Sequence, residues 1–472
     1  MRVAQYIERR DFFRRTAAGL GAIALNQLLA QDSATDPLLV RLPHAKARAK
    51  SVIFIFMSGA PSQLDLLDPK PLMQKHHGEP MPQSMIKDLK DDLIRGSARV
   101  MASPRKFQRY GKSGLEFSEL LPNLGACADD LCVIRSFRTD NANHTPAQFL
   151  MNTGSILAGR PSMGSWVLYG LGSECRDLPG YVVMLSTSQG KGVCGGAANW
   201  SNGFMPSHFR GVSFRNQGDA VLHLSNPEGV SAEMQRGRLD LIRGLNEERA
   251  QATGDSEIAS RVAAYELAFR MQTAAPDLLD FSREPAKILE MYGIGKEPTH
   301  TFGSNCLLAR RMVERGVRFV QLYHSSWDDH NDLHKNLNRH CAITDQPAAA
   351  LIRDLRLRGL LDSTLVIWGG EFGRAPMFEV RRGNTPGKEG RDHHAEAFSM
   401  MMAGAGVRGG QTLGRTDDFG YHVVDQPYHV HDLQATILHQ LGLDHRRLTY
   451  PFQGRQYRLT DVHGNVIAPA LA

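Results

Sequence analysis

The sequence of 472 residues lacks several features by which protein classes are recognised. It holds six cysteines but no Cys-x-x-Cys pair and no tight disulfide framework, and a chain of this size does not need disulfides for stability. No apolar run approaches the roughly 20 residues that span a bilayer. Basic residues are scattered and not interleaved with aromatic residues, so we expect no nucleic acid partner. No internal repeat is found.

The overall composition is that of an ordinary globular protein. Hydrophobic residues make up 42% of the chain and charged residues 22%, with a net charge of +6. The length suits one large α/β domain or two average ones.

The N-terminus resembles a twin-arginine export signal. Arg9 and Arg10 precede Phe12 and Phe13, and a short apolar, small-residue run follows at 17–25. We therefore interpret 1–30 as an export signal read by the twin-arginine machinery, 31–50 as a linker and 51–472 as the exported domain, with a periplasmic or extracellular location. The alternative is an amphipathic N-terminal helix. Twin-arginine export carries folded proteins, which suits a chain that binds its metal before it leaves the cytoplasm.

Apolar runs that read as buried strands alternate with helical spacing. The strands are predicted at 51–57, 131–136, 180–185, 317–323, 364–368 and 398–403. Helices are predicted at 306–315, 348–360 and 430–441, and 231–292 reads as a mostly helical segment outside the sheet. This alternation predicts an α/β fold with a mostly parallel central sheet and helices on both faces, and places 52–57, 317–323 and 364–368 side by side.

Three segments carry carboxylates, and two of these also carry clustered imidazoles. Two of the segments directly follow predicted strands, where an α/β sheet builds its ligand sites. The candidate metal ligands are Asp328, His330, His334, Glu371, Asp392, His393 and His394. The alternatives are a solvated helix start for the first segment, a carboxylate paired with Arg374 for the second and surface histidines for the third. Arg374 beside a metal-bound acid would also suit an anionic substrate.

Four further residues are candidates. His144 and Thr145 lie where a strand turns into a helix whose N-terminus favours anions, so Thr145 is a candidate nucleophile and His144 a candidate base. Thr145 as a plain helix cap is the alternative. Ser58 lies in the turn-rich loop after the first strand, and His431 precedes the last helix, where capping is as good an explanation as function.

The chain resembles the bacterial domain-of-unknown-function family 1501 over nearly all of 50–467. The phrases that carry the resemblance lie at 56–65, 68–71, 159–166, 327–330, 370–374, 391–394 and 454–464. That family is similar to the alkaline phosphatase and sulfatase superfamily, so the resemblance implies an alkaline-phosphatase-like fold and a twin-arginine start.

The superfamily pattern also implies what this chain has lost. His144 stands where sulfatases have the cysteine that becomes the catalytic aldehyde, so the nucleophile is missing or displaced to Thr145. Glu371 and Phe372 stand in place of a metal-binding aspartate and a histidine, and Ser58 and Gly59 stand in place of the paired aspartates after the first strand. The resemblance therefore implies one retained metal site and a damaged second one.

Two functions are consistent with the sequence. The first is a metal-dependent hydrolase of sulfate or phosphate esters, with zinc, calcium or manganese as cofactor and an anionic ester, such as a sulfated polysaccharide, as substrate. The second is a non-catalytic exported protein that keeps the fold for binding or assembly. Bound metal discriminates between them.

Overall fold

The computed structural model describes residues 37–87, 89, 92–187, 189–190, 192–253, 255–380 and 386–472. The predicted export signal at 1–30 and the first part of the predicted linker lie outside these residues. In the described part of the chain, no helix has the length and apolar character needed to cross a membrane.

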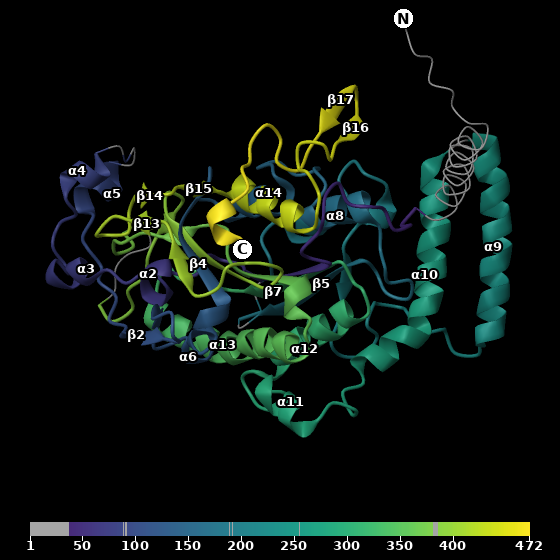
Figure 1. Cartoon of the computed structure of the whole chain (residues 1–472), viewed down its shortest axis with the longest axis horizontal. Coiled ribbons are helices and arrows are strands. Elements are labelled where there is room, and N and C mark those ends of the chain that lie inside the picture. Colours follow the sequence, from purple (N-terminus) through teal and green to yellow (C-terminus); the bar gives the residue numbers. More distant parts are fainter. Residues whose placement is uncertain are drawn as a thin grey trace, which may run out of the picture.

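A nine-stranded sheet forms the centre of the molecule (Figure 1). Its order is β12-β4-β11-β8-β1-β7-β5-β6, with β15 beside β4. The strands are β1 (Ser51–Met57), β4 (Leu131–Arg138), β5 (Tyr181–Thr187), β6 (Val212–Phe214), β7 (Phe319–Ser325), β8 (Thr364–Gly369), β11 (Phe398–Ala403), β12 (Gln411–Leu413) and β15 (Tyr428–His429). All their pairings are parallel except those of β11 with β4 and β8. The prediction of a mostly parallel sheet is confirmed, and β1 lies between β7 and β8.

Helices cover both faces of this sheet. Every residue of its central strand β1 is buried, and successive side chains of a strand point to opposite faces, so both faces of the sheet are shielded from solvent. Ile53 and Ile55 belong to the core that contains α12 (His300–Glu314) and α13 (Leu333–Leu357). Val52 and Phe54 belong to the opposite core, under α7 (His144–Thr153), α8 (Met163–Leu171) and α14 (Val430–Gln440). Two buried cores, one on each face, are what the predicted continuous apolar strands require.

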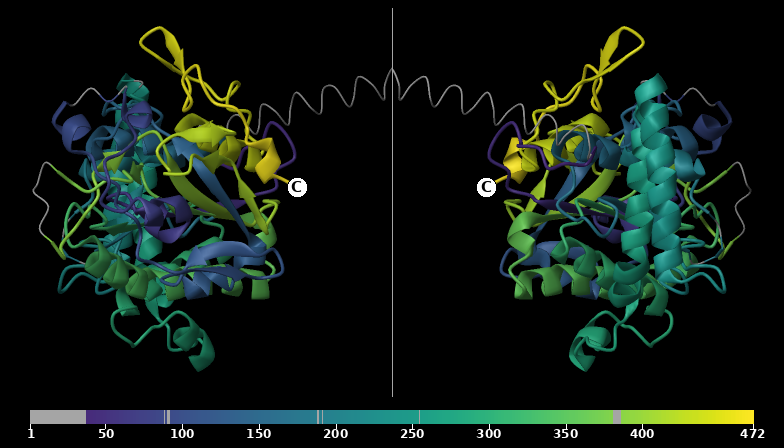
Figure 2. Two further views of the ribbon diagram at one scale, coloured as in Figure 1. Left: turned by 90° about the vertical axis from the view of Figure 1, so that its left-hand side faces the viewer. Right: turned by 90° about the vertical axis from the view of Figure 1, so that its right-hand side faces the viewer.

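The segment 231–292 holds three helices and no strand among its described residues. They are α9 (Ala232–Thr253), α10 (Ser256–Leu279) and α11 (Ala286–Met291). The helices α9 and α10 run side by side at one flank of the molecule, beyond the end of the sheet (Figures 1 and 2).

The remaining elements are short and surround the sheet. The helices are α2 (Gln63–Leu66), α3 (Pro71–Lys75), α4 (Gln83–Ile86), α5 (Asp92–Ser97) and α6 (Pro122–Gly125). The small strand pairs are β2 (Phe107–Tyr110) with β3 (Leu115–Ser118), β9 (Gly373–Arg374) with β10 (His393–His394), β13 (Arg415–Thr416) with β14 (Val423–Asp425), and β16 (Tyr450–Phe452) with β17 (Arg455–Tyr457). The β16–β17 hairpin projects from the body (Figure 2).

A buried ion pair fixes the chain just before β10. The Nε of Arg391 lies 2.9 Å from Asp65 Oδ2 in α2, and both side chains have no exposed surface. Arg391 also donates to the carbonyl of Met101 at 2.8 Å. Burial alone would raise the pKa of Asp65, but the Arg391 guanidinium outweighs it and holds that pKa below 3.8. The pair therefore anchors the segment that carries His393.

We expect Asp65→Asn to destabilise the protein by about 3–5 kcal/mol at pH 7, because it leaves Arg391 buried without its partner. Since the folded-state pKa of Asp65 is depressed, its contribution is present above pH 3.8 and is lost as the pH falls below that value. Chemical unfolding at pH 7 and under acid checks this, and the difference between variant and wild type should shrink under acid. Asp240→Asn, at an exposed acid paired with Arg236, is the control and should leave stability close to that of the wild type.

Candidate metal centre

The loops that follow β1, β7, β8 and β4 meet at one edge of the sheet. The registers Met57 with His324 and Phe56 with Gly369 place the carboxyl ends of the three central strands side by side. Asp328 follows β7, Glu371 follows β8, and His144 begins α7 after β4. This is the edge at which ligands bind in open α/β sheets.

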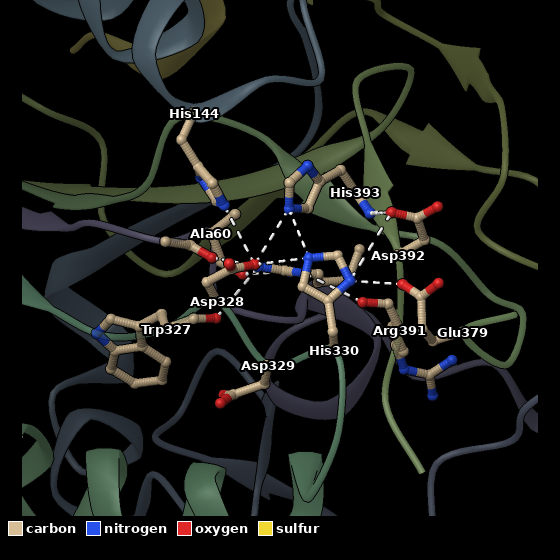
Figure 3. Close-up of polar contacts among 12 residues, drawn as sticks. Ala60, His144, Trp327, Asp328, Asp329, His330, Glu379, Arg391, Asp392 and His393 are labelled. Carbon is tan, nitrogen blue, oxygen red and sulfur yellow. Dashed lines mark hydrogen bonds and ion pairs between the residues drawn. The ribbon is translucent and has the colours of Figure 1, made fainter. Parts of the chain in front are cut away.

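One carboxylate oxygen lies at the centre of the candidate site (Figure 3). The Oδ1 atom of Asp328 is 3.1 Å from the Nε2 atoms of His144 and His393 and 2.9 Å from that of His330. The Nε2 atoms of His330 and His393 are themselves 2.9 Å apart. Four potential ligand atoms from three separate segments therefore converge on one small volume.

Each of the three imidazoles is held from behind through its Nδ1 atom. Glu371 Oε1 lies 2.7 Å from Nδ1 of His144, and Glu379 Oε2 lies 2.5 Å from Nδ1 of His330. The Nδ1 of His393 lies 2.6 Å from the carbonyl oxygen of Ala142. Carboxylates and carbonyls behind histidines are the usual supports of metal-binding imidazoles.

The charged groups of the cluster shift one another's pKa values. Burial would raise the pKa of Asp328, but hydrogen bonds with the three imidazoles hold it far below its usual range. Burial opposes protonation of His144, yet Asp328 and Glu371 together raise its pKa to about 9. The pKa of His330 is also raised, against burial, by Asp328 and Glu379, whereas burial lowers that of His393. The site therefore favours positive charge beside Asp328.

Arg374 does not face open space. Its side chain is fully buried, and its Nε donates to the carbonyl of Ala60 at 3.0 Å. Its two terminal nitrogens donate to the carbonyls of Arg391 and Gly59 and, at 2.8 Å, to Asp328 Oδ1. The guanidinium thus ties three loops and the central carboxylate together.

Glu371 is equally enclosed. It accepts hydrogen bonds from the backbone N–H of Gly59 at 3.0 Å and from the side-chain amide of Gln148 at 2.9 Å, besides its contact with His144. Gln148 also donates to Ser58 Oγ at 2.8 Å. Phe372 stacks against the His144 ring, with 4.9 Å between ring centroids. The structure therefore places Glu371 and Ser58 in the layer behind His144.

The other sequence-predicted residues lie at different distances from this centre. Thr145 follows His144 in the first turn of α7. Asp392 Oδ1 is 4.0 Å from Nδ1 of His330, and Asp392 forms a second candidate metal group with His330 and His393.

Three predicted histidines make contacts elsewhere. The ring of His394 hydrogen-bonds the carbonyl of Tyr421 at 2.6 Å. His431 hydrogen-bonds the carbonyl of Gly154 at 3.2 Å, and its ring stacks on His463. The carbonyl of His334, in the first turn of α13, accepts a hydrogen bond from Arg105 at 2.8 Å.

Sequence reasoning missed two side chains and one carbonyl that complete the site. Glu379, Gln148 and the carbonyl of Ala142 each contact a residue of the cluster. Glu379 is 49 positions from His330 and is not next to any histidine or second acid. Only the helical spacing of Gln148, four residues after His144, was a usable signal.

The donor set fits a divalent ion. Three imidazole nitrogens and one carboxylate oxygen are ligands that zinc and similar borderline ions prefer. Ligand atoms of a tetrahedral zinc site lie about 3.3 Å apart when the bonds are about 2.0 Å long. The atoms of His144, Asp328 and His393 lie within 4.8 Å of one another, and the measured pairs at 2.9–3.1 Å are close to the tetrahedral spacing.

A mostly parallel α/β sheet that gathers these residues at its carboxyl edge defines an α/β protein with a candidate divalent-metal centre. Residues 49–471 match the family described as "Protein of unknown function (DUF1501)", and the chain belongs to that family. The family predicted from the sequence is thereby confirmed. No curated protein matches the chain.

Among solved structures the chain is similar to several sulfatases and phosphoesterases. The protein Ps i-CgsB, solved with k-i-k-neocarrahexaose, is 11% identical, with 84% of this chain and 72% of that chain covered at a TM-score of 0.37. The phosphonate monoester hydrolase SpPMH from Silicibacter pomeroyi is 13% identical, with 74% and 71% covered and a TM-score of 0.33. The sulfatase PsFucS1 from Pseudoalteromonas sp. is 11% identical, with 90% and 71% covered and a TM-score of 0.32.

Gly390 is required by the close packing around His330. A Cβ at this position would lie 2.0 Å from the backbone carbon and oxygen of His330. We expect Gly390→Ala to displace His330 and to weaken metal binding at least tenfold, within the range by which disturbed support of a ligand acts. Metal titration checks this. Gly244→Ala, at a helical glycine of α9 with open space around it, is the control and should leave metal binding unchanged.

Proposed function

We propose that the chain is an exported, metal-dependent hydrolase of sulfate or phosphate esters. One observation carries the proposal: three imidazole Nε2 atoms lie within 3.1 Å of a single oxygen of Asp328, and each ring is held through Nδ1 by an acceptor. Four lone-pair atoms at this spacing repel one another unless positive charge lies among them. A bound divalent ion supplies that charge, polarises an ester oxygen and makes water a stronger nucleophile.

The chain's own residues have the following proposed roles. His144, Asp328, His330 and His393 hold the ion, and Glu371 and Arg374 fix the loops that carry them. The ligand set proposed here is smaller than the sequence-based one. The ring of His394 contacts the carbonyl of Tyr421, and neither His334 nor His394 belongs to a group of potential metal ligands in the described residues. Asp392 borders the set at 4.0 Å from His330.

Thr145 remains the proposed nucleophile within the chain, with water as the alternative. It lies in the first turn of α7, next to His144, where the helix N-terminus favours an anionic substrate group. An anionic ester, of which a sulfated polysaccharide would be one kind, suits a centre whose cation offsets its charge. Export rests on Arg9 and Arg10 in the sequence and is tested separately, by replacing both with lysine and fractionating cells.

The experiment is a paired assay of metal and hydrolysis. The full chain is purified without chelator and tested on aryl sulfates and aryl phosphates, before and after treatment with a chelator and after re-addition of zinc, calcium or manganese. We expect hydrolysis of at least one ester class that is lost with the metal and restored by one of the three ions. Metal binding without any hydrolysis would leave the non-catalytic, fold-retaining protein as the correct reading.

A further inference from the structure

Two buried carboxylates lie behind two of the converging imidazoles. Glu371 contacts Nδ1 of His144 at 2.7 Å and Glu379 contacts Nδ1 of His330 at 2.5 Å. Glu371 is 0% exposed and Glu379 is 1% exposed. Neither carboxylate points its contacting oxygen at Asp328, so each acts on the cluster through a ring.

The contacts decide which nitrogen of each ring keeps its proton when an ion is bound. An ionised carboxylate only accepts hydrogen bonds, so Nδ1 must be the donor. Each ring also contacts Asp328 Oδ1 through Nε2, at 3.1 and 2.9 Å, so without an ion both nitrogens face a carboxylate. An ion bound beside Asp328 would take the Nε2 lone pair and leave the proton of the neutral ring on Nδ1. The opposite tautomer would set the Nδ1 lone pair of each ring against a buried negative charge, which is costly at low dielectric.

We infer that Glu371 and Glu379 are positioning residues that fix the proton of His144 and His330 on Nδ1 and so present both Nε2 atoms to the metal. The inference rests on the proposed function, because it takes these rings to be ligands. It assigns Glu371 to the support of a ligand, where the sequence suggested a ligand itself, and it gives Glu379 a role that no local sequence signal indicated.

The third ring provides an internal comparison. His393 is supported by the neutral carbonyl of Ala142, at a contact distance of 2.6 Å that is comparable with those of the two carboxylates. A carboxylate raises the basicity of its ring more than a neutral carbonyl does, so His144 and His330 should be the stronger donors. Replacing a supporting glutamate by glutamine keeps an acceptor oxygen and removes the charge. The ring would then be supported by a neutral carbonyl, as His393 is.

Glu379 is itself held in place by its backbone. Its N–H donates to the carbonyl of Gly390 at 2.9 Å, and Gly390 packs directly against the backbone of His330. The supporting carboxylate and the ring it supports are therefore fixed to the same segment, as a positioning role requires.

The test is a competition titration with zinc and a chromophoric chelator on the full chain. Glu371→Gln and Glu379→Gln are each expected to bind zinc 10–100-fold more weakly than the wild type. Asp354→Asn is the matched control, because Asp354 is a fully buried carboxylate that pairs with Arg310 and Arg358 away from the site. It should lower the melting temperature and leave the zinc affinity unchanged.

The outcomes separate this inference from the proposed function. If the wild type binds zinc and both glutamine variants bind it equally well, the positioning role is wrong and the metal site stands. An equal loss in Asp354→Asn would show general destabilisation and would also overturn the inference. A wild type that binds no divalent ion overturns the inference and the proposed function together.

A second measurement does not depend on the folding of any variant at the glutamates. In ¹⁵N spectra of histidine-labelled, zinc-loaded wild type, assigned with single histidine variants, His144 and His330 should have a protonated Nδ1 and a metal-bound Nε2. Metal-bound Nδ1 atoms would contradict the assigned roles of both carboxylates.

Discussion

Asp328→Ala is expected to abolish metal binding and hydrolysis together. The replaced oxygen lies within 3.1 Å of three imidazole nitrogens and 2.8 Å from the guanidinium of Arg374. Removing it takes away a ligand and the only carboxylate oxygen that contacts all three rings in the described residues. The loss of metal affinity should exceed the roughly 10–100-fold effect of a supporting carboxylate. Zinc titration and ester hydrolysis measure it.

Glu396→Ala is the matched control for this change. Glu396 is an exposed acid two residues beyond β10, so its removal alters the charge near the site without touching the cluster. It should keep wild-type metal content and activity. An Asp328→Ala protein that retains its metal would show that the ion is bound elsewhere.

Arg374→Ala is expected to destabilise the protein strongly. The guanidinium is fully buried and joins the carbonyls of Gly59, Ala60 and Arg391 to Asp328. Its removal leaves these acceptors without a donor and Asp328 without its arginine partner, at a cost of about 3–5 kcal/mol. For a chain of this length the melting temperature should fall by about 3–5 °C. The melting temperature of Arg374→Lys should fall almost as far, since lysine lacks the planar guanidinium group that donates to several acceptors at once.

Arg408→Ala serves as the control, because Arg408 is exposed and its side chain donates to the carbonyl of Leu471, away from the site. Its melting temperature should stay within about 1 °C of the wild type. If Arg374→Ala kept the wild-type melting temperature and only raised the KM for an ester, the arginine would bind substrate, as the sequence had suggested.

The sheet was predictable where burial alone dictates the residues. The runs at 51–57, 317–323 and 364–368 are apolar throughout because β1, β7 and β8 are covered on both faces, and the three are neighbours as predicted. The direction of β11 was not predictable, because its run Phe398–Ala403 is apolar in the same way but pairs antiparallel with β4 and β8. Strand direction depends on the path of the chain, which no residue of the strand encodes.

The helix predicted at 348–360 is wrong at both ends, since α13 spans Leu333–Leu357. Its first half carries buried polar residues, so the apolar spacing that marks a helix is weak there. Asp345, for example, can be buried because its carboxylate accepts hydrogen bonds from the backbone N–H groups of Asn123 and Leu124 at 2.9 Å. Pro347 lies inside this helix. Proline usually ends a helix, but tertiary contacts keep α13 continuous here.

The candidate site was predictable in its residue types and only partly in its membership. The carboxylate and imidazole after one predicted strand pointed to Asp328 and His330, and the dense cluster at 392–394 pointed to His393; the structure brings all three together with His144. The sequence did not show which of the two adjacent histidines faces the site. His393 points to Asp328, while His394, one residue later in β10, points to Tyr421. Adjacent strand residues face opposite sides, but which side holds the site is a tertiary fact.

Metal analysis of the full chain purified without chelator, beside His330→Ala, tests the central claim most directly. We predict close to one equivalent of a divalent transition ion in the wild type and a clear loss in the variant, accompanied by a lower melting temperature, since binding to the folded state alone stabilises it. A wild-type protein that carries no such ion, and whose melting temperature does not respond to added zinc, calcium or manganese, would contradict the claim that His144, Asp328, His330 and His393 form a metal centre.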